Sequence, residues 1–193
     1  MSDHRPTTET TTDEADVVDL LLRQHALIRD LFDEVETGGD RAGAFRRLVR
    51  MLAVHETAEE EIVHPVARRV LDGGEDVIDE RLAEEHEAKE MLDRLDQLGP
   101  DDPEFDKNLQ VLRAAVLAHA RSEERYEFTL LRALTNEAER RSMTLGVKAA
   151  EAMAPTRPHP GVESATANVL LGPPVAIMDR TRDLIRKAMG TDG

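Results

Sequence analysis

Two related stretches of sequence decide how this chain folds: HETAEEEIVHPV, which begins at His55, and HARSEERYEFTL, which begins at His119. Each opens with His-x-x-x-Glu, so that His55 is followed by Glu59 and His119 by Glu123. Residues four apart on an α-helix are neighbours on one face, so each pair points in one direction. Apolar residues continue the same face on both sides, which indicates that it is the buried face. The sequence therefore predicts His and Glu where two packed helices should present leucine.

Four amphipathic segments contain or flank these stretches. Their apolar residues recur at three- and four-residue steps, which indicates α-helix. Gly-Gly or Gly-Pro pairs separate the segments, and Gly readily adopts the conformation that ends a helix. Because connections this short favour antiparallel neighbours, we predict an all-α protein built on an up-down-up-down four-helix bundle. The expected helices span residues 16–36, 41–71, 75–98 and 103–134, and Pro65 should kink the second or end it early.

The rest of the chain is assigned to two flanking regions. Residues 1–15 are polar and Thr-rich, so we expect a disordered N-terminal tail. Residues 16–134 form the predicted bundle, and residues 135–193 a helical C-terminal extension that packs against its outside. Within the extension we expect helices at 136–153 and 175–189, and the sequence indicates no function for it.

Composition excludes several classes of protein. The net charge of −15 should repel nucleic acid and anionic membranes, so neither is an expected partner. The absence of cysteine excludes disulfides, thiolate catalysis and cysteine-ligated metal centres. No signal peptide and no long apolar run is found, so a cytoplasmic location is expected. Only 3% of residues are aromatic, so the core must be aliphatic.

The chain also resembles a duplication that brings its histidines together. One His lies 30 residues before the first motif and another lies 33 residues before the second. A carboxylate in an apolar core costs several kcal/mol unless it is compensated, and two facing carboxylates also repel. Divalent cations remove both problems, because imidazole and carboxylate are their natural ligands. We therefore predict two metal ions with two carboxylates free to bridge them, held by His25, His55, Glu59, His86, His119 and Glu123.

This ordered set resembles the hemerythrin-like family, the HHE cation-binding domains. The shared features are a lone His on helix one, His-x-x-x-Glu on helix two, Glu85-His86 on helix three and His-x-x-x-Glu on helix four. Ferritin-like sites instead use Glu followed by His three residues later. The resemblance covers residues 16–134 and implies an antiparallel four-helix bundle with an oxygen-bridged, non-haem centre of two iron ions. Zinc or manganese would also suit these ligands.

Two positions differ from the oxygen-carrying members of that family. Those proteins have a second His on helix three where this chain has Glu90, and an Asp five residues after the helix-four His where this chain has Glu123 after four. Anionic oxygen ligands stabilise ferric iron, so we expect a protein that reacts with or senses oxygen, peroxide or a related small diatomic ligand, rather than an oxygen carrier. A peroxide-decomposing (catalase-like) or oxidase-type enzyme remains an alternative, as does an iron- or redox-sensing module with an unknown protein partner.

Five further residues near the motifs have separate expected roles. Glu56 follows the first motif His directly, as in some family members, and is included as a further metal ligand. His64 lies half a turn away from that His and is expected to be a surface or packing residue. Glu90 and Glu124 are expected to be solvated. Tyr126 should face the core, either as a packing residue or as a hydrogen-bond donor near the metals.

Overall fold

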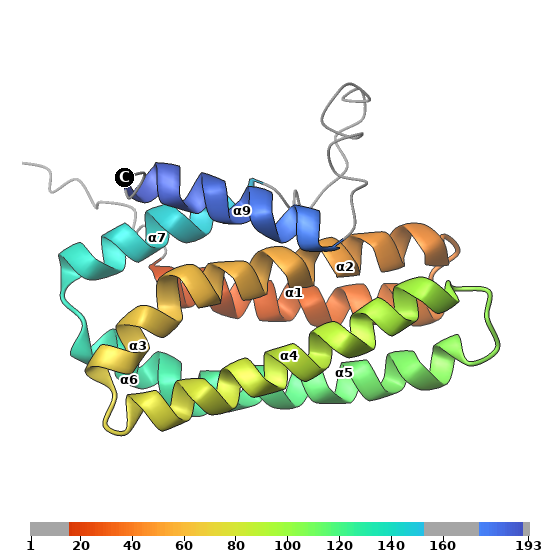
Figure 1. The fold of residues 1–193 in the computed structure, drawn as a ribbon, viewed down its shortest axis with the longest axis horizontal. Coiled ribbons are helices and arrows are strands. Elements are labelled where there is room, and N and C mark those ends of the chain that lie inside the picture. Colours follow the sequence, from red (N-terminus) through yellow and green to blue (C-terminus); the bar gives the residue numbers. More distant parts are fainter. Residues whose placement is uncertain (1–15, 153–173, 191–193) are drawn as a thin grey trace, which may run out of the picture.

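The computed structural model describes residues 16–152 and 174–190, and within these ranges every regular element is helical. Four helical rods lie side by side and alternate in direction, which confirms the predicted all-α bundle (Figure 1). None of the described helices is long and apolar enough to cross a membrane. The tail expected at residues 1–15 lies outside the described residues. The rods are α1 (Val17–Thr37); α2 (Arg41–Ala58) with η1 (Glu59–Val63) and α3 (His64–Val70); α4 (Gly74–Leu98); and α5 (Phe105–Ser122) with η2 (Glu123–Glu127) and α6 (Phe128–Leu134).

Local sequence explains where the first rod begins and what the rods bury. Asp16 caps α1 by accepting from the backbone N–H of Asp19, while the Asp19 side chain accepts from the backbone of Asp16. This reciprocal arrangement satisfies two backbone donors that the helix leaves open. The core between the rods is mainly aliphatic, as expected, with Phe32, Phe105 and Phe128 as its largest fully buried side chains.

The second and fourth rods each contain a π-helical segment at equivalent positions. One begins at Glu59 and the other at Glu123, the carboxylates of the two His-x-x-x-Glu motifs. A π-helical turn closes hydrogen bonds five residues apart and so takes up one residue more than an α-helical turn. Residues beyond it are therefore rotated relative to a continuous α-helix. Pro65 follows the first such segment in the opening turn of α3, and the rod continues to Val70 instead of ending early.

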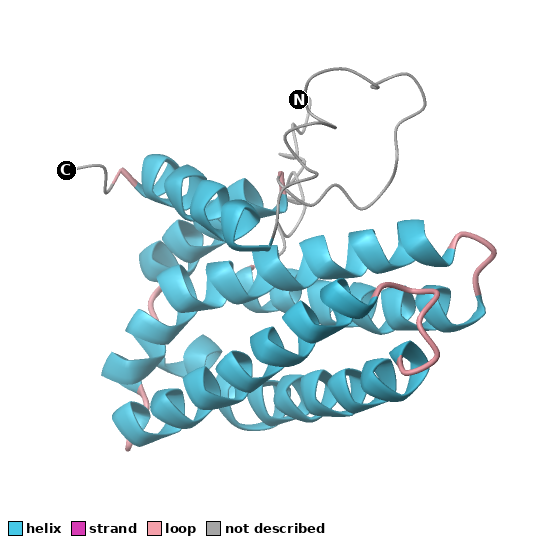
Figure 2. Ribbon diagram, turned by 45° about the vertical axis from the view of Figure 1, so that its right-hand side comes forward, coloured by secondary structure: helices cyan, strands magenta, loops and turns pink. Residues whose placement is uncertain are grey.

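Two further helices, α7 (Glu137–Glu151) and α9 (Pro174–Met189), cover the first two rods. They pack against each other and against α2, and α7 also contacts α1 (Figures 1 and 2). The absence of a side chain at Gly146 permits this approach, because a Cβ there would lie 2.6 Å from Ile62 Cδ1 and 3.0 Å from Met189 Sδ. The second rod is thus covered by α7 and α9 at its π-helical segment.

Candidate metal centre

The bundle interior holds a cluster of His and Glu side chains at the level of the two π-helical segments. Every rod contributes to it. All but one of these side chains are 5% exposed or less, and the His119 side chain is 12% exposed. The cluster consists of His25 from α1, His55 and Glu59 from the second rod, Glu85 from α4, and His119 and Glu123 from the fourth rod.

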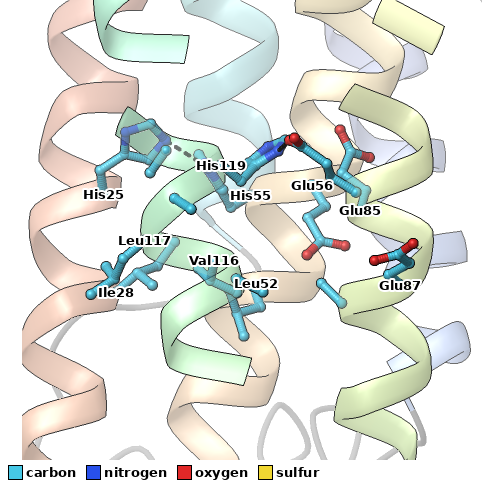
Figure 3. Close-up of a pocket in the computed structure, with 15 residues that line it drawn as sticks. His25, Ile28, Leu52, His55, Glu56, Glu85, Glu87, Val116, Leu117 and His119 are labelled. Carbon is cyan, nitrogen blue, oxygen red and sulfur yellow. Dashed lines mark hydrogen bonds and ion pairs between the residues drawn. The ribbon is translucent and has the colours of Figure 1, made fainter. Parts of the chain in front are cut away.

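A first group of possible ligands combines His25, His55, Glu59 and Glu123, which offer atoms within 4.8 Å of one another. The His25 and His55 Nε2 atoms are 3.1 Å apart (Figure 3). His25 Nε2 is 3.4 Å from Glu123 Oε2, and His55 Nε2 is 3.4 Å from Glu59 Oε2. Two nitrogens bound at right angles to one ion at about 2.1 Å would lie about 3 Å apart. The spacing of the two imidazoles therefore suits a single ion.

A second group combines Glu59, Glu85 and His119, again with atoms within 4.8 Å of one another. Glu59 belongs to both groups. Glu123 also reaches towards the second, because its Oε1 lies 3.4 Å from His119 Nε2. Two adjoining groups with carboxylates between them are the arrangement that a pair of ions would require.

Several polar atoms of the cluster are buried without a hydrogen-bond partner. They include both carboxylate oxygens of Glu59 and of Glu123, one oxygen of Glu85, and His119 Nε2. Leaving such groups unpaired costs more than a hydrogen bond contributes, and the cost is greater for charged groups. A cation would satisfy oxygen and nitrogen atoms together, so the side chains present fit a bound metal.

The environment moves the pKa values of the two motif carboxylates in opposite directions. Burial, and then the charge of Glu123, raise the pKa of Glu59 well above its usual range. Burial would also raise the pKa of Glu123, but the His119 and His25 rings outweigh it and lower that pKa. Without metal, a proton in the cluster therefore favours Glu59 over Glu123.

The pKa values of two imidazoles in the cluster are also shifted in opposite directions. Burial, and then the nearby His25, hold the pKa of His55 well below its usual value of 6.5. Burial lowers the pKa of His119 too, but Glu123 and Glu84 outweigh it and raise that pKa to about 10. Metal binding at His119 must displace the proton that this ring holds, so the metal affinity should increase with pH.

The Nδ1 atom of each imidazole is hydrogen-bonded to a side chain outside the cluster. This leaves Nε2 directed at the cluster in all three rings. Such contacts orient metal-binding histidines and are needed for full affinity. Glu124, expected to be solvated, is instead 29% exposed and accepts a hydrogen bond from the His25 ring. The contacts are His25 Nδ1 to Glu124 at 2.9 Å, His55 Nδ1 to Gln24 at 2.8 Å, and His119 Nδ1 to Glu84 at 2.9 Å.

Comparison with known proteins agrees with this geometry. The family described as hemerythrin HHE cation-binding domain matches residues 16–131. The chain belongs to this family. An uncharacterized hemerythrin-like protein of Schizosaccharomyces pombe is 23% identical over 89% of this chain and 87% of its own length. A DNA nickase of Nostoc is 29% identical over 60% of this chain, but the match spans only 33% of that longer protein. No solved structure matches.

One residue predicted as a ligand of this HHE domain is not brought to the cluster. The His86 side chain is 75% exposed and pairs with Glu90, which is solvated as expected. Successive helix residues are turned by about 100°, so the residue before it, Glu85, faces inward instead. The seven-residue spacing of the inward stripe could have identified this position from sequence. The buried residues of α4 after its first turn are Ile78, Arg81, Glu85, Ala88, Leu92 and Leu95.

We expect Glu85→Gln and His86→Gln to differ sharply in metal content. Glu85→Gln removes a charged ligand from the second group only, so bound metal should fall from two ions per chain to about one. His86→Gln changes an exposed side chain and should leave the metal content unchanged. Elemental analysis of both variants after anaerobic reconstitution measures this difference. Loss of metal in His86→Gln with retention in Glu85→Gln would show that helix α4 turns the other residue inward.

The π-helical segments also explain where Tyr126 and His64 lie. Tyr126, expected to face the core, is 61% exposed, and the next residue, Glu127, is buried in its place. His64, expected on the surface or in packing, is 2% exposed, and its ring contacts Glu85 Oε1 at 2.6 Å. Tyr126 lies within η2 and His64 directly follows η1, so 100° steps from the motif His misplace both.

Glu56 is buried beside the cluster but belongs to neither ligand group. Burial, and then the charge of Glu85, raise its pKa to about 8, and Lys89 Nζ lies 3.7 Å from its Oε2. Its role as a ligand stays a prediction. It lines a cavity of about 160 Å³ that the three histidines of the cluster border at one end (Figure 3). Ile28, Leu52 and Val116 form the apolar part of the same cavity.

Proposed function

We propose that this HHE domain binds two iron ions and that the loaded site reacts with or senses oxygen, peroxide or a related small diatomic ligand. Cation binding follows from the family, whereas the identity and number of the ions are part of the proposal. The supporting observation is the position of Glu59, which is shared by both ligand groups and has neither oxygen hydrogen-bonded.

The proposed ligands divide between two ions. His25 and His55 would serve the first ion, His119 and Glu85 the second, and Glu59 with Glu123 would contact both. Bound iron would supply electrons to a small oxidant, because its two common oxidation states differ by one electron. The residues of the chain hold the rings in place, supply negative charge and keep bulk water away from the buried face of the site.

The cavity supports a small reactant. An apolar cavity of about 150 Å³ can accommodate benzene, so one of about 160 Å³ has room for oxygen or peroxide beside the histidines. Glu56 borders this space, and its pKa of about 8 keeps it protonated at neutral pH. Its carboxyl group can therefore hold a proton next to the reactant, as reduction of oxygen or peroxide requires.

The name of the Nostoc relative raises action on DNA as a second function. The net charge of −15 disfavours it, because proteins bind nucleic acid largely by neutralising phosphates with Lys and Arg. We therefore propose small-molecule chemistry in preference to DNA cleavage.

Metal analysis tests the proposal directly. After anaerobic reconstitution with Fe(II) and removal of unbound metal, we expect about two iron ions per chain. Less than half an equivalent of any transition metal would contradict a metal function. Peroxide consumption by the iron-loaded protein, compared with the same protein loaded with zinc, then separates turnover from sensing. Turnover supports a peroxide-decomposing enzyme, whereas a spectral change without turnover supports a sensor.

A further inference from the structure

We propose that Glu151, at the end of α7, is a positioning residue that keeps the His55 imidazole ready for metal through the Gln24 amide. This inference rests on the proposed metal function, because it concerns how well the site binds its ion. It also assigns a role to the C-terminal extension, since α7 lies outside the matched residues 16–131.

A chain of hydrogen bonds connects α7 to the cluster. Gln24 Nε2 donates to Glu151 Oε1 at 3.1 Å, and His55 Nδ1 lies 2.8 Å from Gln24 Oε1. Gln24 is 3% exposed and His55 is 4% exposed, so neither exchanges these partners freely with bulk water. The three side chains come from α7, α1 and α2, so the extension reaches the candidate metal site across the first rod.

The chemistry of these groups determines where the protons lie. An ionised carboxylate only accepts hydrogen bonds, so Glu151 must face the NH₂ group of Gln24. The Gln24 carbonyl oxygen then faces His55, and it also only accepts, so Nδ1 of the ring must carry the proton. A neutral imidazole protonated at Nδ1 has its lone pair on Nε2, the atom that a metal would bind. Glu151 thereby selects the metal-binding tautomer of His55.

The facing imidazole is arranged in the same way. His25 Nδ1 lies 2.9 Å from a carboxylate oxygen of Glu124, so this nitrogen also carries its proton. In their neutral forms both rings therefore direct lone pairs at each other, with their Nε2 atoms 3.1 Å apart. A cation between them relieves this repulsion. If Gln24 turned its NH₂ group towards His55 instead, that ring would protonate at Nε2, donate to His25 and close the metal position.

The packing of α7 holds Glu151 in this role. Gly146, on the same helix, lets α7 approach the π-helical segment η1 so closely that a Cβ would lie 2.6 Å from Ile62 Cδ1. Helix α7 therefore rests on the segment that begins with Glu59 while its last residue reaches Gln24. The extension therefore covers the second rod and also fixes the tautomer of His55.

The test compares Glu151→Gln with Glu137→Gln in the full chain. Both changes remove one carboxylate from α7 while keeping its shape, but Glu137 is exposed and pairs with Arg141, four residues further along the same helix. A glutamine at position 151 can donate as well as accept, so it no longer prevents the Gln24 amide from turning. We expect Glu151→Gln to release Fe(II) to a chromophoric chelator about tenfold faster than the wild type or more, with Glu137→Gln unchanged.

A second measurement uses the metal-free protein. Long-range ¹H–¹⁵N NMR spectra identify which ring nitrogen of His55 is protonated. We expect Nδ1 in the wild type and in Glu137→Gln, and a substantial fraction of Nε2 protonation in Glu151→Gln. An unchanged tautomer in Glu151→Gln overturns the inference, even if iron is released faster, because the effect would then be structural. If the wild type binds no iron, the proposed function fails, while the NMR comparison still decides the role of Glu151.

Discussion

Glu59→Gln is expected to abolish binding of both metal ions, not just one. Glu59 is the residue shared by the two ligand groups, so its loss removes a charged ligand from each of them. An amide cannot replace the charge of a carboxylate that contacts two cations in a buried site. Elemental analysis after anaerobic reconstitution should therefore fall from about two ions per chain to less than half an ion.

Two control variants should lose less metal than Glu59→Gln. Glu85→Gln affects the second group alone and should retain about one ion. Glu90→Gln removes a carboxylate that is 72% exposed and should retain both. In the metal-free protein Glu59→Gln should be as stable as the wild type or more so, because it removes a buried acid whose pKa is raised by burial and by Glu123. Normal metal content in Glu59→Gln would mean that this residue is structural.

The metal-free protein should lose stability as the pH rises from about 6 to 9. Burial raises the pKa of Glu127 from 4.5 to about 7 and that of Glu56 from 4.5 to about 8. An acid with a higher pKa in the folded state than in the unfolded state contributes less stability as the pH rises through that interval. His119, with its pKa raised to about 10, acts in the same direction, because the stability from its protonated form is lost above pH 6.5.

Two other groups determine how the stability of the metal-free protein changes at acidic pH. The pKa values of His55 and Glu123 are both lowered in the folded protein. The stability that His55 contributes is therefore lost as the pH falls below 6.5, and that of Glu123 is lost as the pH falls below 4.5. The metal-free protein should therefore be most stable near pH 6. Each pKa unit corresponds to about 1.4 kcal/mol, so the loss towards pH 9 should reach several kcal/mol. The melting temperature should fall by about 5 °C or more.

Bound metal should reverse this dependence. Protons compete for the same ligand atoms, so the affinity for metal rises with pH and its stabilisation of the native state rises with it. Thermal melting with chelator and with Fe(II), under anaerobic conditions at pH 6 and pH 9, measures both trends. Glu56→Gln should flatten the metal-free curve, whereas the exposed Glu90→Gln should not. A metal-free protein that becomes more stable towards pH 9 would contradict the assigned burial of these acids.

Most of the cluster could be predicted from sequence. His55 with Glu59 and His119 with Glu123 lie on the apolar faces of their own helices, and α-helical geometry alone directs each pair to one side. The position of His25 along the bundle axis followed from its separation of 30 residues from His55. The structure brings these residues together because their positions depend on the local period of the chain and on short connections between neighbouring helices.

What the sequence determined by itself is the helical bundle, its core faces and five of the six residues in the cluster, because 3.6-residue periodicity is a local property. The seven-residue spacing of Ile78, Glu85 and Leu92 could have indicated the inward position of Glu85, but only the tertiary structure decided that α4 is rotated so that Glu85 meets Glu59 and His119. It also decided the π-helical segments, which move His64 and Glu127 inward and Tyr126 outward. The contact from Glu151 through Gln24 joins residues 127 positions apart, and only packing can bring them together.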